Sequence, residues 1–354
     1  MSINRPFMDS CQRGNTIQQK YVSAVGSAYI NDPGGFGNKV LNVGSSFPDC
    51  RAVFPVSAVG WVATFRWAVT NLPSSGISGI VGFFDGVAGV EQGGICINSD
   101  GTLQAYKNNA AVGSKTTQSF LPGQVLQLQV KYIVDPVNGL IEARLQGQPG
   151  ALLSFTGNTR TTANSFANAI NFKTTPFSVN GNYFSDIFLF DTVNPAAGTE
   201  YDTLVDYPGN VKVALLMPNN DSATGGLNQM TPTPAQPAGS HYLDINHTAT
   251  LGDTQYLAAA TAPLRESFQL PALPASAAEI VGLLPFDLSR IDDAGPHTNR
   301  LGLRNNGADT FTTDFTPLSS YGYQEGFFRT NPGTSGLFVP ADIPNTEVQV
   351  EQDS

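Results

Sequence analysis

The sequence predicts an all-β protein made of β-sandwich domains, and three observations carry this prediction. One strand-like run enters Asp100-Gly101 and another leaves it, which is the strongest short signal of a hairpin with a type I′ turn. Residues 60–69 and 125–134 alternate between apolar and polar side chains, as half-buried strands do. No segment shows a sustained helical period. Many short strands without helices pack as sandwiches or barrels.

The first half of the chain contains a series of predicted strands separated by turn residues. One apolar face is expected on 60–69 (Trp61, Ala63, Phe65, Trp67, Val69) and another on 125–134 (Leu126, Leu128, Val130, Tyr132, Val134), with Gln127, Gln129 and Lys131 opposite. Residues 136–139 predict an Asn-Gly hairpin into 140–146. The apolar stretch 52–69 contains Pro55 and Arg66, which favours a buried strand over a membrane span. The other predicted strands are 21–30, 39–43, 77–84, 94–98, 102–108 and 179–190.

The second half restarts the strand pattern after a connection rich in Pro, Gly, Asn, Asp and Thr at 191–208. We expect an N-terminal arm or early edge strand at 1–20, a first domain at 21–207 and a second at 208–354. A long polar loop is expected at 218–240, and turns at 292–296 and Asn306-Gly307. The predicted strands are 211–217, 254–258, 265–270, 279–284, 298–305 and 321–330.

Charge and length exclude several classes of function. The chain has 354 residues, which predicts about two domains, and its net charge is −10 with 18 Lys and Arg. An acidic chain argues against nucleic acid as a partner and against an anionic membrane surface. Charged residues make up 13% of the chain, so the surface polarity must come from Asn, Thr, Ser and Gln. No signal peptide is visible.

The cysteines and histidines do not form a pattern for metal or catalysis. Cys11, Cys50 and Cys96 are expected to be buried thiols, with a Cys11–Cys50 bridge as the alternative. The three histidines, at positions 241, 247 and 297, are expected on the surface or in turns, because zinc needs three or four ligands in tight geometry. No nucleophile elbow or phosphate-binding loop is present. We therefore predict no catalytic residue, no cofactor and no metal ligand.

Four carboxylates of the first half are candidates for a glycosidase pair: Asp85, Glu91, Asp100 and Asp186. The sequence cannot place two of them across a cleft, and the hairpin turn alone explains Asp100. Loop carboxylates could hold calcium, with Asp32 or Asp186 as ligands, but ordinary turn capping is the simpler interpretation.

The aromatic residues of two strands have two interpretations. Trp61, Phe65, Trp67, Phe83 and Phe84 could line a sugar-binding platform, but alternating aromatics on one strand are typical of a core. We predict that they are core.

Three motifs of the first half resemble a known family. They are Asp-Pro-Gly-Gly at 32–35, the stretch 94–103 with its Asn-Ser-Asp-Gly turn, and the strand 182–191. The last resembles an aromatic-Ile-Asp-Asp-hydrophobic-Tyr strand, of whose two acids this chain keeps one, Asp186. Together they resemble the concanavalin A-like (laminin G-like) jelly-roll domain of virion proteins of tailed bacteriophages.

The second half resembles the β domain that follows in the same phage proteins. The motifs are Val-Lys-Val at 211–213 leading to Pro-Asn at 218–219, then 252–256, 328–334 and 338–342. The resemblance spans about residues 7–350. It implies a concanavalin A-like jelly-roll sandwich followed by a second β-sandwich, in a structural, non-enzymatic virion component such as a fibre, decoration or tail accessory protein.

The same resemblance implies particular partners. Other virion proteins of the capsid or tail are expected, and the chain is expected to form a homo-oligomer, with a trimer as the family's habit. A host-surface glycan is a further expected contact. The alternative function is a secreted carbohydrate-binding, lectin-like module, because the same fold supports both functions.

Overall fold

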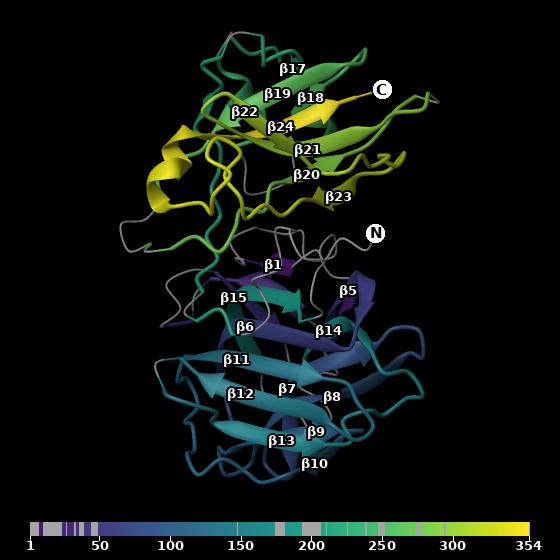
Figure 1. The fold of residues 1–354 in the computed structure, drawn as a ribbon, viewed down its shortest axis with the longest axis vertical. Helices are drawn as coiled ribbons and strands as arrows, with labels where there is room; N and C mark the ends of the chain where they lie inside the picture. The colour runs from purple at the N-terminus through teal and green to yellow at the C-terminus, as the bar shows by residue number, and fades with distance from the viewer. Residues whose placement is uncertain are drawn as a thin grey trace. The chain divides into compact units, whose positions relative to one another are not determined.

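The computed structural model contains two compact units, residues 1–214 and 215–354. Each unit is described separately below, and both are drawn in Figure 1. Among the described residues, no helix is long and apolar enough to cross a membrane. The structure describes residues 7–9, 23–25, 27–31, 33–34, 39–43, 49–146, 148–173, 181–192, 207–209, 211–224, 226–237, 239–246, 252–273, 277, 279–293 and 295–353.

The predicted fold class is confirmed, because the chain is all-β and its first unit is a jelly-roll sandwich of two antiparallel sheets. The first sheet has the order β13-β12-β11-β6-β15-β4-β3, and β1 also pairs with β15. Its strands are β1 (Phe7–Asp9), β3 (Ser27–Ile30), β4 (Val40–Val43), β6 (Gly60–Val69), β11 (Leu126–Ile133), β12 (Gly139–Leu145), β13 (Leu153–Gly157) and β15 (Asn182–Asp191).

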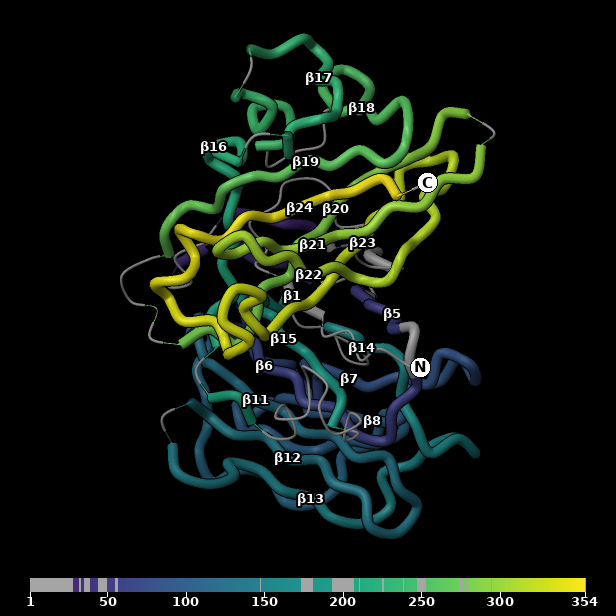
Figure 2. The backbone as a smooth tube through the Cα atoms, turned by 45° about the horizontal axis from the view of Figure 1, so that its top comes forward, coloured from purple at the N-terminus to yellow at the C-terminus, as the bar shows by residue number. Residues whose placement is uncertain are grey.

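The second sheet of this unit has the order β10-β9-β8-β7-β14-β5-β2. Figure 2 follows both sheets as a continuous tube. The strands of this second sheet are β2 (Ser23–Val25), β5 (Asp49–Ala58), β7 (Ile77–Asp85), β8 (Val90–Asn98), β9 (Leu103–Lys107), β10 (Ala110–Val112) and β14 (Ala167–Lys173).

Alternation explains how the two sheets meet. The apolar faces predicted for 60–69 and 125–134 both lie in the same buried cluster. Phe65 contacts Phe172 of the opposite sheet edge-on, with ring centroids 5.9 Å apart, and Phe83 stacks on Tyr132 at 4.8 Å. Large aromatic side chains therefore fill the space between the sheets, which confirms that these faces are core.

The stretch 52–69, expected as one buried strand, is two strands in different sheets. β5 ends at Ala58 and pairs with β14, whereas β6 begins at Gly60 and pairs with β11. The chain crosses from one sheet to the other at Val59. Gly60, the first residue of β6, is the turn residue at this crossing, and the apolar residues on either side of it make the stretch resemble one strand.

The predicted hairpins exist, but two of their turns differ from the type I′ expectation. Gly101 has φ +79° while Asp100 keeps a negative φ, and the Gly101 N–H donates to the Asn98 carbonyl at 3.0 Å. This is a type I turn followed by a left-handed glycine, the usual form of a longer loop. Positive φ at both central residues occurs instead at Asn108-Asn109 and at Asn306-Gly307. At residues 136–139 the Asp135 carboxylate accepts from the Val137 and Asn138 N–H groups and shapes the turn.

A β-bulge interrupts β15 and sets which side chains face the core. The register against β6 shifts between Ser185 and Phe188, and Asp186 has φ +50°, a conformation that Asp tolerates better than most residues. Because of the extra residue, Phe184 and Ile187 both point into the core. Asp186 is thereby turned to the opposite, outer face of the first sheet, where its partners lie.

The second unit is a smaller β-sandwich with a less regular second layer. Its main sheet has the order β16-β19-β24-β21-β22, and the separate ribbon β20-β23 continues through a bridge from Leu283 to Phe328. Leu303, Phe328, Phe338 and Ile343 form the core. The elements are β16 (Asn220–Asp221), β17 (Thr231–Thr233), η1 (His241–Asp244), η2 (Gly252–Thr254), β18 (Tyr256–Ala258), β19 (Leu264–Gln269), β20 (Phe286–Ser289), β21 (Asn299–Asn305), β22 (Ala308–Phe311), β23 (Gly322–Glu325), η3 (Pro340–Asn345) and β24 (Thr346–Gln352).

Several expectations for this half are wrong. Residues 211–217 are not a strand, and 279–284 contribute only an isolated bridge. The region 218–240 contains β16 and β17 rather than one long loop. The central strand β24 was missed, because its sequence, TEVQVEQ, is mostly polar and resembles an exposed terminus.

Candidate functional site

A short segment without secondary structure lies across the outer face of the first sheet. We call residues 207–209 and 211–213 the strap. The Gln127 amide donates to the Val211 carbonyl at 3.3 Å, and the Gln129 amide donates to the Gly209 carbonyl. Gln129 is only 5% exposed. The glutamines predicted to face away from the core do so, and the strap covers them.

Asp186 holds the end of the strap. Its carboxylate accepts from the Val213 N–H at 3.1 Å, and the Arg66 guanidinium lies 3.8 Å away. Burial raises the pKa of Asp186, although Val213, Arg66 and Lys212 oppose that rise. Asp186 is a candidate catalytic or calcium-binding acid by sequence, and in the structure its oxygens contact the strap and Arg66.

The beginning of the strap is held by an aromatic contact. The Tyr207 hydroxyl donates to the Glu142 carboxylate at 2.9 Å, and Arg144 donates to the same oxygen at 2.9 Å. The Arg144 guanidinium also lies over the Tyr207 ring, 3.9 Å from its centroid. Both ends of the strap are therefore fixed to side chains of the sheet.

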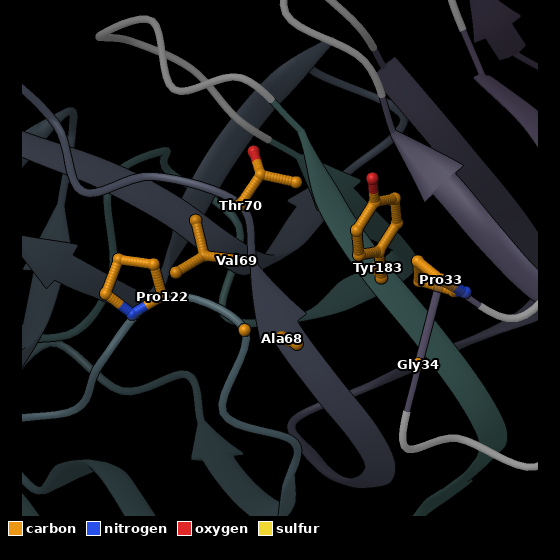
Figure 3. A pocket seen from close by; sticks show the side chains of 8 residues that line it. Pro33, Gly34, Ala68, Val69, Thr70, Pro122 and Tyr183 are labelled. Carbon is orange, nitrogen blue, oxygen red and sulfur yellow. The ribbon is translucent and has the colours of Figure 1, made fainter.

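The same outer face carries a pocket of about 370 Å³ at the end of β6 and the beginning of β15 (Figure 3). Tyr183 and Ala68 are cross-strand partners on this face. The pocket is lined by Pro33, Gly34, Ala68, Val69, Thr70, Pro122, Gly123 and Tyr183. We call it the outer-face pocket.

The walls of the outer-face pocket are fixed by backbone bonds. The Gly123 N–H donates to the Val69 carbonyl at 2.8 Å, and Gly123 has φ +77°, which an L-residue with a side chain rarely adopts. The Thr70 N–H donates to the Gly181 carbonyl at 3.2 Å. Beneath the pocket, Val40 and Ala68 are buried against Tyr183 and Val125.

The chemistry of the outer-face pocket is neutral. None of its lining side chains is ionisable at neutral pH, and the available groups are an aromatic ring, two prolines, a hydroxyl and backbone. Such a surface offers an apolar face and a few hydrogen bonds, so it can bind but has no acid–base pair for hydrolysis.

The other weighed carboxylates have structural partners. Asp85 is fully buried and accepts from the Val87 and Ala88 N–H groups, the Thr162 hydroxyl and the Asn164 amide. Burial alone would raise the pKa of Asp85, but these donors together outweigh it and hold the pKa below its usual value. Asp85 thus fixes the loop 158–166 to the β7–β8 hairpin.

Asp100 and Glu91 lie at different places again. Asp100 is exposed and forms an ion pair with Lys115 at 2.8 Å, beside bonds from Thr102. Those contacts hold the pKa of Asp100 well below its usual range. Glu91 lies beside the buried Tyr106 hydroxyl, whose pKa is raised by burial and then by Glu91. A Cβ at Gly82 would collide with both groups, so this glycine allows their close packing.

The structure tests two further expectations, the surface or turn position of the histidines and the sugar platform of aromatic rings. His241, expected at the surface or in a turn, begins η1, but its ring is largely buried and bonds the fully buried Glu266 at 2.8 Å. His297 bonds Asp293 at 2.6 Å. Among the described residues no group of three His, Cys, Asp or Glu could hold a metal ion. Trp61, Trp67, Phe65 and Phe83 are at most 1% exposed, which excludes a sugar platform on these rings. Phe84 is 7% exposed and lies outside the buried cluster between the sheets, with the Arg51 guanidinium 3.7 Å from its ring centroid.

The remaining predicted residues can be placed only in part. Cys50 and Cys96 are buried, as expected. Cys11, Asp32 and His247 lie outside the described residues, so the Cys11–Cys50 alternative and the Asp32 calcium ligand stay predictions.

The sequence analysis missed Tyr183 and the strap. Tyr183 alternates with the core residues Asn182 and Phe184, which is the signal that could have placed it on the outer face. Nothing local marks the strap, because its bonds run to residues between 27 and 84 positions earlier in the chain.

No protein-family model matches the sequence, and no curated protein matches it. Among solved structures, a sialidase is 12% identical over 49% of this chain and 17% of that chain, with a TM-score of 0.35. Trypanosoma rangeli sialidase in complex with the inhibitor DANA is 12% identical over 46% of this chain and 27% of that chain, with a TM-score of 0.32. Cellulose induced protein, Cip1, is 13% identical over 52% of this chain and 90% of that chain, with a TM-score of 0.35. This chain thus spans less than a third of these sialidases, and likeness at this level carries no argument about function.

Proposed function

We propose that this protein is a structural, non-enzymatic component of a tailed-bacteriophage virion, such as a fibre, decoration or tail accessory protein. The non-enzymatic part of this proposal rests on the hydrogen bonds that three buried carboxylates accept. Asp85 fixes a loop, Asp186 fixes the strap and Glu266 bonds the Met230 N–H and His241. Each of these carboxylates bonds a segment that packs beside it in the fold. This favours a role in holding the structure together over a role in catalysing hydrolysis.

The virion assignment rests on the resemblance of both halves to phage proteins and on the character of the surface. With charged residues at 13% of the chain, a large interface with neighbouring virion proteins would desolvate few ions. A homo-oligomer, with a trimer as the first expectation, would use such interfaces. The outer-face pocket is the surface proposed to contact a host glycan.

The test of the virion assignment is to find the protein on particles. Particles of a phage that encodes this chain would be purified by density gradient, and the chain would be sought by mass spectrometry and by gold-labelled antibody. We expect it at a fixed number of copies in one part of the particle. Its absence from particles, while it is abundant in the infected cell, would overturn the proposal.

The oligomer is tested by light scattering on three forms of the purified chain. Removing residues 1–6 leaves β1, which pairs with β15, whereas removing residues 1–20 also removes β1. We expect the full-length mass to be a multiple of the chain mass and to fall only in the longer truncation. A full-length protein that is monomeric at every concentration would contradict the homo-oligomer.

The second candidate is a secreted carbohydrate-binding module, and the neutral outer-face pocket with Tyr183 favours it. An aromatic ring can cover the apolar face of a sugar while hydroxyl and backbone groups bond its edge. On a glycan array, Tyr183→Ala should remove binding, while Tyr256→Ala, an exposed tyrosine in the second unit, should leave it unchanged. Strong glycan binding together with absence from particles would favour this candidate.

A further inference from the structure

The second unit has a pocket of its own, of about 270 Å³, whose lining is polar. We call it the β21–β24 pocket, because two of its side chains come from these neighbouring strands. Drug-sized ligands occupy pockets of about 300–1,000 Å³, so this one is suited to a small ligand. It is lined by Thr224, Gln269, Arg304, Asn306, Gly307, Pro344, Asn345 and Glu347.

Two opposite charges in this pocket face each other without pairing. Arg304 and Glu347 are direct cross-strand partners, a position where opposite charges usually interact. Arg304 instead donates to Asp309 at 2.8 Å. Glu347 accepts from the Ser222 hydroxyl at 2.9 Å and from the Ser267 hydroxyl at 2.7 Å. Each charge is held by a different neighbour, so the space between them stays open.

The rim of the β21–β24 pocket is fixed by the fold. Asn306 and Gly307 have φ of +49° and +84°, and they form the tight turn between β21 and β22. On the other side, the buried Asn305 amide donates to the Asp342 carbonyl at 3.2 Å and to the Thr346 hydroxyl at 2.9 Å. These bonds hold the end of η3, and with it Pro344 and Asn345. A pocket with such walls loses little entropy when it binds a ligand.

We propose that the β21–β24 pocket binds a neutral polyhydroxyl ligand, specifically a single sugar ring. Glu347 accepts from two hydroxyl groups, Ser222, which lies 2.9 Å from both carboxylate oxygens, and Ser267, so acceptor positions remain for a ligand hydroxyl. Arg304 has N–H groups beyond the one that bonds Asp309. The amides of Gln269, Asn306 and Asn345 can each donate and accept, as hydroxyl groups require, and Pro344 supplies an apolar wall.

The competing ligand is a free amino acid, whose carboxylate would bond Arg304 and whose ammonium group would bond Glu347. The structure favours the sugar, because Asp309 already compensates Arg304 and the serine hydroxyls already solvate Glu347. A zwitterion would gain little from charges that are compensated in this way, whereas a neutral ligand needs only the remaining donors and acceptors. This inference stands independently of the proposed function, since it concerns binding by the purified chain in solution.

The experiment uses saturation-transfer NMR and calorimetry on the full-length chain. The probes are the methyl α-pyranosides of glucose, galactose and mannose, with glycine and alanine as the amino-acid arm. We expect saturable binding of at least one glycoside with a Kd of about 1 mM, the range for a few hydrogen bonds and one small apolar contact. Binding should be absent or at least tenfold weaker for the amino acids.

Variants then assign the binding to this pocket rather than to the first unit. Asn345→Ala and Gln269→Ala should each weaken the glycoside about fivefold, the effect of one hydrogen bond. The matched control Asn138→Ala, an exposed amide in a turn of the first unit, should leave the affinity unchanged. Tyr256→Ala, an exposed tyrosine of the second unit that does not line this pocket, should also leave it unchanged.

Three outcomes would overturn the inference. The first is no saturable binding of any of the three glycosides. The second is glycoside binding that both Asn345→Ala and Gln269→Ala leave intact. The third is tighter binding of glycine or alanine than of every glycoside, which would identify the pocket as an amino-acid site. None of these outcomes bears on whether the chain is found on particles.

Discussion

The two units of this protein bury different kinds of side chains. In the first unit the space between the sheets is filled by apolar and aromatic side chains such as Trp61 and Trp67. In the second unit one face of the main sheet carries charged and polar side chains in register. Arg265, Glu351 and Arg300 form one row across β19, β24 and β21, and Glu351 is 4% exposed. The first core depends on shape, whereas Glu351 on the polar face of the second unit depends on its two arginine partners.

The polar face of the second unit is covered by an aromatic ring. A Cβ at Gly302 would collide with Phe311, so the glycine leaves room for the ring to lie on the sheet. The guanidinium groups of Arg265 and Arg300 lie 4.8 Å and 4.6 Å from the centroid of that ring. The arginines thereby contact both an aromatic face and the carboxylate of Glu351, which holds them in place.

The largest expected effect tests the apolar side of this comparison. Trp67 is 1% exposed and its indole N–H donates to the Asn182 side chain at 2.9 Å. Trp67→Ala should lower the free energy of unfolding by about 3–5 kcal/mol, through the cavity it leaves. Chemical denaturation followed by far-UV circular dichroism measures it. Trp67→Phe should lose much less, and equal losses in the two variants would mean that ring packing is not what stabilises this core.

The second prediction tests the polar side. Glu351 accepts from Arg265 and from Arg300, each at 2.5 Å. Glu351→Ala would leave two partly buried guanidinium groups without their carboxylate, at a cost of about 2–3 kcal/mol. The control is Asp353→Ala, an exposed acid 3.4 Å from Arg300, with a cost below about 0.5 kcal/mol. Thermal unfolding of both variants should separate them, and a Glu351→Ala protein as stable as the control would contradict the partner requirement.

The third prediction concerns two buried acids with opposite pKa shifts. The pKa of Asp85 lies below its ordinary value of 3.8, so its contribution to stability is present above pH 3.8 and is lost as the pH falls through the folded-state pKa. Burial raises the pKa of Glu266 above its ordinary value of 4.5, even though Met230 and His241 bond it. Its contribution is therefore present below pH 4.5 and is lost as the pH rises through the folded-state pKa.

The variants Asp85→Asn and Glu266→Gln reveal these two signs. Asp85→Asn should cost about 1–3 kcal/mol at neutral pH and less below pH 3.8. The free energy of unfolding of Glu266→Gln, relative to that of the parent, should be highest at neutral pH and lowest near pH 4.5. The chain has two tryptophans, both in the first unit, so their fluorescence follows Asp85→Asn. Hydrogen exchange of β19 amides follows Glu266→Gln. Parallel pH profiles for the two variants would refute the assignment.

The fourth prediction concerns the strap. Asp186→Ala removes the carboxylate that accepts from the Val213 N–H and faces Arg66, and should cost about 1 kcal/mol. Lys212 lies within the strap, so limited trypsin digestion should cleave after Lys212 faster in this variant than in the parent. Asn138→Ala serves as the control and should not change the rate. Unchanged cleavage at Lys212 would show that Asp186 does not fix the strap.

The smallest expected effect is at the surface of the first unit. Lys115 and Asp100 are both about half exposed, at 47% and 51%, although their ion pair is only 2.8 Å long. Lys115→Met should change the free energy of unfolding by less than about 0.5 kcal/mol, and less still in 1 M salt. A loss comparable to that of Glu351→Ala would mean that burial is not what distinguishes the two ion pairs.

The sequence predicted the first unit better than the second, for a physical reason. Strands β6 and β11 alternate cleanly because one face of each packs on an apolar core, and alternation is what a sequence pattern can detect. Strand β24 has no such contrast, since its Glu and Gln residues are buried by partners on β19 and β21. Those partners are distant in sequence, so no local window contains the information.

The candidate sites were harder to predict than the folds. Trp61, Phe65, Trp67 and Phe83 are core as predicted, but Phe84 lies outside the core cluster. The sequence does not reveal that the Asp186 carboxylate bonds the Val213 N–H. The β21–β24 pocket joins Gln269, Arg304 and Glu347 from three strands, and no spacing in the chain brings these together. The turn Asn306-Gly307 at its rim was predictable, because type I′ turns depend on local residues alone.

The bulge at Ser185 and Asp186 makes this point of β15 more sensitive to the deletion or insertion of a residue than to a substitution. Before the bulge Phe184 faces the core, and after it Ile187 and Leu189 do, although the spacing from 184 to 187 is odd. Deleting a single residue at 185 or 186 would force one side of the strand to exchange its inward and outward side chains. In a library of single-residue insertions and deletions, this point should therefore be among the least tolerant in the first unit, while substitutions of Ser185 are tolerated far better.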